Sequence, residues 1–166
     1  MRRLFALLAL VPLTLGCSTP GVASQSDPLL KTLDTLYEAF CFDAGGEADW
    51  AAMEALFADG AAFVSPGAAH AVDAEQFLVD FREFIRTSPL GKTGFHERIL
   101  KVRVDHFGSI AHAWVAFEGF VPGEVEARTR GLDSIQFVLE DEQWRLVSFT
   151  TQYEREGLPL PTRFGR

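Results

Sequence analysis

Residues 130–154 read RGLDSIQFVLEDEQWRLVSFTTQYE, and apolar and polar side chains alternate along two runs of this stretch. The runs are residues 132–139 and 144–153, and the acidic residues 140–142 separate them. Alternation with a period of two is typical of a half-buried β-strand. A short turn can join only antiparallel neighbours, so the stretch predicts two antiparallel strands at the end of the chain.

The residues before this stretch predict two more strands. Residues 96–104 alternate, and residues 109–120 form a long, mostly apolar run after a turn at 105–108. A polar loop at 122–128 leads into the strand pair that follows, which makes four strands in an antiparallel meander. On the first strand the alternation predicts one face with His96, Arg98, Leu100, Val102 and Val104, and an opposite face with Glu97, Lys101 and Arg103.

Helical periodicity dominates the first half of the chain. Asp27-Pro28 is typical of a helix start, and apolar residues then recur on one face as far as Phe40. A short helix is predicted at 47–57, a short strand at 61–64, and a third helix behind a capping box at Asp73. Helices followed by antiparallel strands predict an α+β fold in which a curved antiparallel sheet wraps around the helices.

The N-terminus has the features of a secretory signal. Two arginines follow Met1, and residues 4–15 form an apolar run that is too short to span a bilayer. The end of this run, LTLGC, resembles a bacterial lipoprotein signal box with Cys17 as the lipidated residue, although Thr14 stands where leucine is usual. A plain secretory signal followed by an incidental cysteine is the alternative.

These features give the expected domain organisation. We expect a signal peptide at 1–16, a lipidated cysteine and flexible tether at 17–27, a folded domain at 28–157 and an irregular tail at 158–166. The protein would then sit in the bacterial cell envelope, and Ser18 after the cysteine favours the outer membrane, facing the periplasm. Lipid would supply the attachment to the membrane.

Composition excludes several classes of protein. The 166 residues are 48% apolar and carry a net charge of −8, so a single domain is expected and a nucleic-acid partner is not. Two cysteines are too few for a disulfide scaffold. The four histidines show no ligand spacing and no glycine-rich phosphate loop is present, so we expect neither a metal nor a cofactor.

Two phrases of the sequence resemble a known superfamily. ALFADGAAFVSPG at 55–67 follows the second predicted helix, and the stretch at 130–154 closes the predicted sheet. Over about residues 28–155 the chain resembles the nuclear transport factor 2-like, or cystatin-like, fold, in its polyketide-cyclase-like (SnoaL-like) and ketosteroid-isomerase-like branches. The resemblance implies a cone with a cavity between sheet and helices, and dimers that form through the sheet.

The comparison with the isomerase can be made residue by residue. That enzyme uses a general-base carboxylate, with a tyrosine and a protonated aspartic acid as oxyanion hole. By resemblance Tyr37 stands at the tyrosine and Asp133 at the neutral acid, while Ser65 replaces the base. A serine cannot abstract a carbon-bound proton unaided, so the pattern argues against an isomerase of that type. A core tyrosine and a solvated strand-end aspartate are the structural alternatives.

Three functions follow as hypotheses. The first is binding of an unknown small hydrophobic or amphipathic ligand without catalysis. The second is an isomerase, cyclase or dehydratase that uses Tyr37 and Asp133 to polarise a carbonyl, with His70 or His96 as base. The third is a homodimeric assembly module. The residues expected to line the ligand cavity are Tyr37, Phe63, Ser65, His96, Arg98, Trp114 and Asp133.

Overall fold

The structure is a computed structural model, and it describes residues 27–164. The predicted signal peptide, Cys17 and most of the predicted tether lie outside the described residues. The elements are α1 Pro28–Phe40, β1 Phe42–Asp43, α2 Trp50–Leu56, β2 Phe57–Val64, β3 Val72–Asp73, α3 Ala74–Thr87, α4 Leu90–Thr93, β4 Gly94–Phe107, β5 Ile110–Phe120, β6 Thr129–Glu140 and β7 Gln143–Tyr153.

Both predicted helix starts are capped as the sequence indicates. The Asp27 carboxylate accepts a hydrogen bond from the backbone N–H of Leu29 at 2.9 Å, with Pro28 in the first turn. Asp73 accepts from the backbone N–H of Gln76 at 2.8 Å. Each bond satisfies a backbone donor that the first helical turn leaves free.

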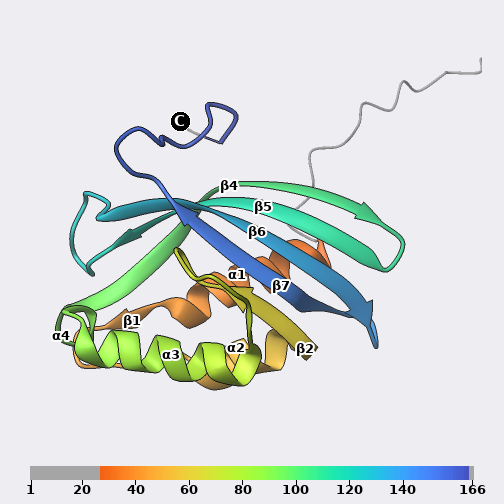
Figure 1. The fold of residues 1–166 in the computed structure, drawn as a ribbon, viewed down its shortest axis with the longest axis horizontal. Coiled ribbons are helices and arrows are strands. Elements are labelled where there is room, and N and C mark those ends of the chain that lie inside the picture. The colour runs from red at the N-terminus through yellow and green to blue at the C-terminus, as the bar shows by residue number, and fades with distance from the viewer. Residues whose placement is uncertain (1–26, 165–166) are drawn as a thin grey trace, which may run out of the picture.

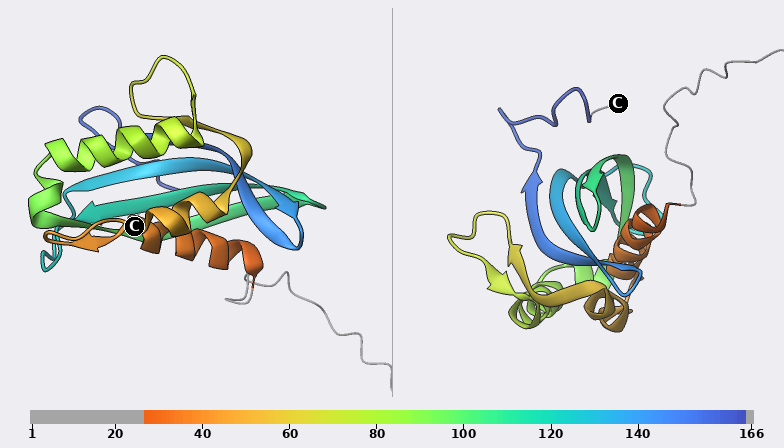
Figure 2. Two further views of the ribbon diagram at one scale, coloured as in Figure 1. Left: turned by 90° about the horizontal axis from the view of Figure 1, so that it is seen from below. Right: turned by 90° about the vertical axis from the view of Figure 1, so that its right-hand side faces the viewer.

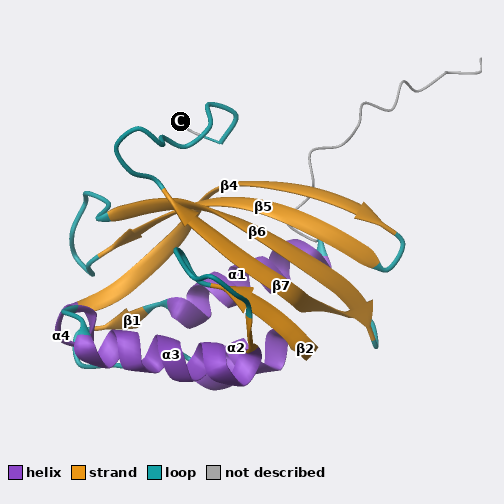
Figure 3. Ribbon diagram, viewed as in Figure 1, coloured by secondary structure: helices purple, strands orange, loops and turns teal. Residues whose placement is uncertain are grey.

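Within residues 27–164 the sheet has seven strands, in the order β1-β4-β5-β6-β7-β2-β3. Strands β4 to β7 form the predicted antiparallel meander, while β2 pairs with β7 in parallel. Figure 1 and Figure 3 show the helices gathered on one side of this curved sheet. The predicted α+β class, with a curved sheet around helices, is confirmed.

The two faces of the sheet are distinct. The inner face, toward the helices, carries Val115 and Phe117 of β5, Ile135 of β6 and Phe149 of β7, all buried in the core. The outer face carries the alternate residues, among them Trp114. Strand β5 is apolar on both faces, so its sequence did not reveal which residues face the helices.

The end of the chain covers part of the outer face. After β7 the chain makes a turn bridged between Arg155 and Leu158, without a further helix or strand in the described part. Phe164 is only 2% exposed, and its ring lies 6.3 Å from that of Trp114, centre to centre. Figure 1 and Figure 2 show this tail on the opposite side of the sheet from the helices.

Candidate functional site

The inner face holds a buried hydrogen-bonded network. Tyr37 of α1 donates its hydroxyl to Oδ2 of Asp133 on β6, and Thr151 of β7 donates its hydroxyl to Oδ1 at 2.7 Å. Tyr37 is 3% exposed and Asp133 is 2% exposed. The structure therefore brings together the two residues that sequence reasoning named as candidate polar groups.

Burial governs the chemistry of this network. It raises the pKa of Asp133 from 3.8 to about 7, against the opposing effect of the hydrogen bonds from Tyr37 and Thr151. The pKa of Tyr37 is raised well above its ordinary value, first by burial and then by the Asp133 charge. Ionised Asp133 accepts from Tyr37. Protonated Asp133 can instead donate to the Tyr37 oxygen, which frees the phenolic proton for another acceptor.

Glu97 of β4 is a candidate functional residue that sequence reasoning missed. Its carboxyl makes no hydrogen bond or ion pair with any residue of the described chain, yet burial and the nearby Asp133 raise its pKa well above the ordinary value. Part of the Glu97 surface remains accessible to water. The Glu97 carboxyl is therefore unpaired within the described chain and remains within reach of water. Such a group is a candidate binding or acid–base residue.

A β-bulge places Glu97 on the inner face. The pairing of β4 with β5 shifts between Ile99 and Lys101, so one extra residue enters β4 and the strand changes faces there. Before the bulge Phe95 and Ile99 pack against the core, and after it Val102 and Val104 do so. The signal was present in the sequence, because these apolar residues change from odd to even numbers.

The same bulge makes two predictions wrong. His96 and Arg98 do not line the interior, because they alternate with Phe95, Glu97 and Ile99. His96 lies 3.2 Å from the exposed carboxylate of Asp43. Arg98 pairs on the outer face with Glu118, which is 1% exposed and also accepts from Arg130 at 3.3 Å.

The other three residues predicted to line the cavity make no hydrogen bond or ring contact with the Tyr37–Asp133 pair in the described chain. Trp114 lies on the outer face, where its ring is 5.0 Å from that of His112, so its placement in the cavity is wrong. Ser65 follows β2 in an exposed turn and has no described contact with Tyr37 or Asp133. Phe63 is on the inner side, but its ring is stacked 4.3 Å from that of Phe77 in the core.

Three aromatic rings pack next to one another on the inner face of the sheet. The ring of Phe117 lies 6.2 Å from that of Tyr37 and 6.0 Å from that of Tyr153, the last residue of β7. Tyr153 is 41% exposed, and burial together with Glu97 and Asp133 raises its pKa to about 12. We call Tyr37, Glu97, Asp133, Thr151 and Tyr153 the inner-face site.

The sulfur of Cys41 helps to hold this arrangement. It lies 3.2 Å from the carbonyl oxygen of Tyr37 and accepts from the backbone N–H of Glu97 at 3.2 Å. The end of α1 is thereby attached to β4 at the residue that carries the free carboxyl. Burial raises the pKa of the Cys41 thiol, so the structure favours a positioning residue over a reactive nucleophile.

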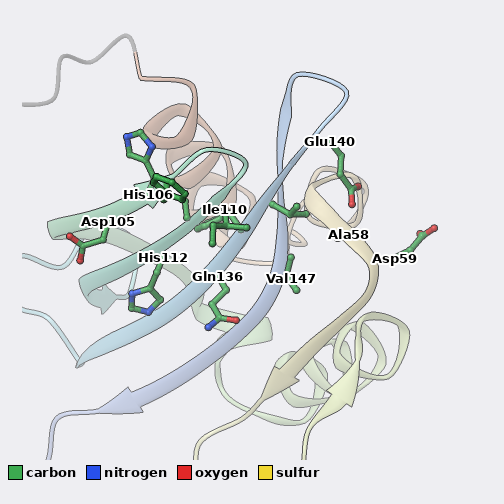
Figure 4. Close-up of a pocket in the computed structure, with 13 residues that line it drawn as sticks. Ala58, Asp59, Asp105, His106, Ile110, His112, Gln136, Glu140 and Val147 are labelled. Atoms are coloured by element: carbon green, nitrogen blue, oxygen red, sulfur yellow. The ribbon is translucent and has the colours of Figure 1, made fainter.

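A hollow of about 750 Å³ lies elsewhere, on the outer face. Figure 4 shows His112, Gln136 and Val147 on its floor, with the helices behind the sheet. His112 bonds to Ser134 at 2.9 Å, and Ser148 donates to Gln136 at 3.3 Å, so the central polar side chains of this hollow already have partners. The unpartnered carboxyl is on the other face. We therefore assign the chemistry to the inner-face site.

The described residues contain neither a cluster of metal-binding side chains nor a helix that could span a membrane. Among residues 27–164, no three histidine, cysteine or acidic side chains gather closely enough to hold a metal ion. None of the described helices is long and apolar enough to cross a membrane.

The fold and the site define an α+β protein in which a curved sheet wraps around the helices. A buried tyrosine–aspartate pair links the first helix to the sheet. The SnoaL-like domain family matches residues 33–150, and the chain belongs to that family. A search of curated proteins finds no significant match.

Solved structures support the nuclear transport factor 2-like, or cystatin-like, fold. A cystatin-like protein of unknown function from Nostoc punctiforme is similar with a TM-score of 0.62 and 12% identity, covering 81% of this chain and 93% of that one. A protein from Parabacteroides distasonis, named as a candidate ketosteroid isomerase, has a TM-score of 0.54 and 12% identity, covering 76% and 86%. At these identities the likeness shows the fold alone.

Proposed function

We propose that the protein binds a small amphipathic molecule at the inner-face site. The observation that carries this proposal is the Glu97 carboxyl, which lies on the inner face without a partner in the described chain and close enough to Asp133 for the two charges to interact. A ligand that donates a hydrogen bond to this carboxyl would replace the water that now reaches it. The partly exposed Tyr153 ring would contact the apolar part of the ligand.

The test is an amide NMR titration of the chain from Ser18 to Arg166 with n-octanol, a neutral amphipathic probe. We expect saturable shifts centred on Glu97, Thr151 and Tyr153, and weaker binding in Tyr37→Phe. Glu83→Gln is the matched control, because Glu83 is an exposed carboxylate on α3. Shifts that centre on His112 and Gln136 instead would assign binding to the outer hollow and contradict the proposal.

A second candidate is an enzyme of the isomerase, cyclase or dehydratase type. Glu97 favours it, because this titratable carboxyl could act as the base that Ser65 cannot provide. The Glu97 carboxylate would take a proton from the carbon next to a carbonyl, and Tyr37 would donate to the developing enolate oxygen. In D₂O, exchange of the α-protons of cyclohexanone should then be faster with the native chain than with Glu97→Gln. Equal rates would exclude this chemistry for that ketone.

The place of the protein in the cell is also part of the proposal. Lipidation at Cys17 would anchor the domain in the bacterial envelope, with the folded part facing the periplasm. The full chain should then partition into the detergent phase of a cloud-point separation, and Cys17→Ser should move to the aqueous phase. Native mass spectrometry of the chain from Ser18 onward tests the homodimer, which requires twice the monomer mass.

A further inference from the structure

Among the described residues, the inner-face site contains carboxyl and hydroxyl groups but no cationic side chain. Glu97 of β4 lies on the same face of the sheet as Asp133 of β6 and Tyr153 of β7, and Asp133 is hydrogen-bonded to Tyr37 of α1. The charge of Glu97 contributes to the raised pKa values of Tyr37 and Tyr153, and that of Asp133 contributes to the raised pKa of Glu97. Within the described chain, the groups that act on the pKa values of these four residues are acids, hydroxyls and burial, and no arginine, lysine or histidine is among them. The arginines nearest in sequence, Arg98 and Arg130, pair with Glu118 on the outer face.

This distribution of charge discriminates between ligand head groups. A carboxylate would face two carboxyl groups, with no cation to offset the repulsion. An ammonium would give the Glu97 carboxylate its missing partner, as a charge-assisted hydrogen bond. The half-exposed ring of Tyr153 adds a surface that attracts a cation, and the net charge of −8 raises the local concentration of cations.

We propose that the inner-face site selects a protonated hydrophobic amine, with the ammonium bound by Glu97 and the apolar chain in contact with the partly exposed Tyr153 ring. This inference rests on the proposed binding function and specifies its ligand class. Asp133 is less suited to the direct contact, because both of its oxygens already accept hydrogen bonds. Glu97 is therefore the specificity-determining residue.

Proton release provides a signature of this binding mode. Because the pKa of Glu97 is raised in the free protein, an ammonium that pairs with the carboxylate competes with a proton held more tightly than on an ordinary glutamate. The affinity for an amine should therefore increase as the pH rises through the pKa of Glu97, while the amine itself stays protonated. A neutral alcohol faces no such competition, and its affinity should change little or decrease over the same range.

The experiment compares three probes with one chain length: n-octylamine, n-octanol and n-octanoate. Calorimetry at pH 8 should give the amine at least tenfold tighter binding than either of the others, since a charge-assisted hydrogen bond is stronger than a neutral one. Glu97→Gln should abolish this preference, and Glu83→Gln should retain it. Titrations of the native chain in two buffers of different ionisation enthalpy should detect the released proton without any variant.

The outcomes separate the two proposals. If the amine binds no tighter than the alcohol while the alcohol still shifts Glu97 and Tyr153, the ligand class is wrong and the binding site stands. If the amine preference survives in Glu97→Gln, general attraction by the negative surface explains it and the inference is overturned. If none of the probes shifts the inner-face site, both proposals fail.

Discussion

Replacing Asp133 by asparagine should remove a pH dependence of stability that the buried carboxyl causes. The pKa of Asp133 is raised from 3.8 to about 7 in the folded protein, mainly by burial. Below pH 3.8 this carboxyl is protonated in both the folded and the unfolded chain. Between pH 3.8 and about 7 the folded chain holds a proton that the unfolded chain has released, so stability falls as the pH rises.

The size of this effect follows from the pKa change. Each tenfold change in proton affinity corresponds to about 1.4 kcal/mol, so a pKa rise from 3.8 to about 7 lowers the free energy of unfolding by about 4 kcal/mol at pH 8. Asparagine has nearly the same shape and does not titrate. It retains an oxygen that can accept from Tyr37 or from Thr151.

Urea denaturation of the native chain and Asp133→Asn, followed by circular dichroism from pH 4 to pH 8.5, measures the difference in stability. We predict that the native chain loses about 4 kcal/mol relative to the variant across this range, mostly below pH 7. Glu83→Gln retains Asp133, so its stability should decline with pH as that of the native chain does. A difference between native chain and Asp133→Asn that does not vary with pH would refute a raised pKa at this residue.

Three further substitutions test the outer face, a turn and the packing of the inner face. Glu118→Ala should lower the free energy of unfolding by about 1–2 kcal/mol, because two partly exposed arginines lose the carboxylate that accepts their hydrogen bonds; an unchanged free energy of unfolding in urea denaturation would contradict this role. Glu142→Gly should stabilise the protein by about 1 kcal/mol, since Glu142 has a φ of 63°, and an unchanged or lower melting temperature would contradict strain in this turn. Gly131→Ala should destabilise it by about 1–3 kcal/mol, because the added methyl group would collide with the Phe117 ring, whereas unchanged thermal unfolding would mean that the ring moves away freely.

The sequence predicted the order of elements well because local signals set it. The capped helix starts at Asp27 and Asp73 and the alternation in 132–153 depend on neighbours in sequence, and the structure has helices and strands there. The Tyr37–Asp133 pair could also be predicted from the sequence, because the apolar face of the first helix and the alternation of the sixth strand each direct one of these residues inward.

The rest of the site depends on features that are not local. One bulge in β4 reversed the faces of His96, Glu97 and Arg98, and a strict period of two cannot represent an inserted residue. Trp114 was misplaced because β5 is apolar on both faces. Its outer cover is Phe164, which lies 50 residues further along the chain.

The central claim is that Glu97 lies unpaired on the inner face, where the Asp133 charge and its surroundings raise its pKa. A titration of the ¹³C-labelled side-chain carboxyl groups by NMR, in the native chain and in Glu97→Gln, tests it most directly. We predict one glutamate with a pKa well above its usual value, absent from the variant and shifted downward when n-octylamine binds. If Glu97 titrates near the ordinary glutamate value of about 4.3, its carboxyl is solvated and the proposed site is contradicted.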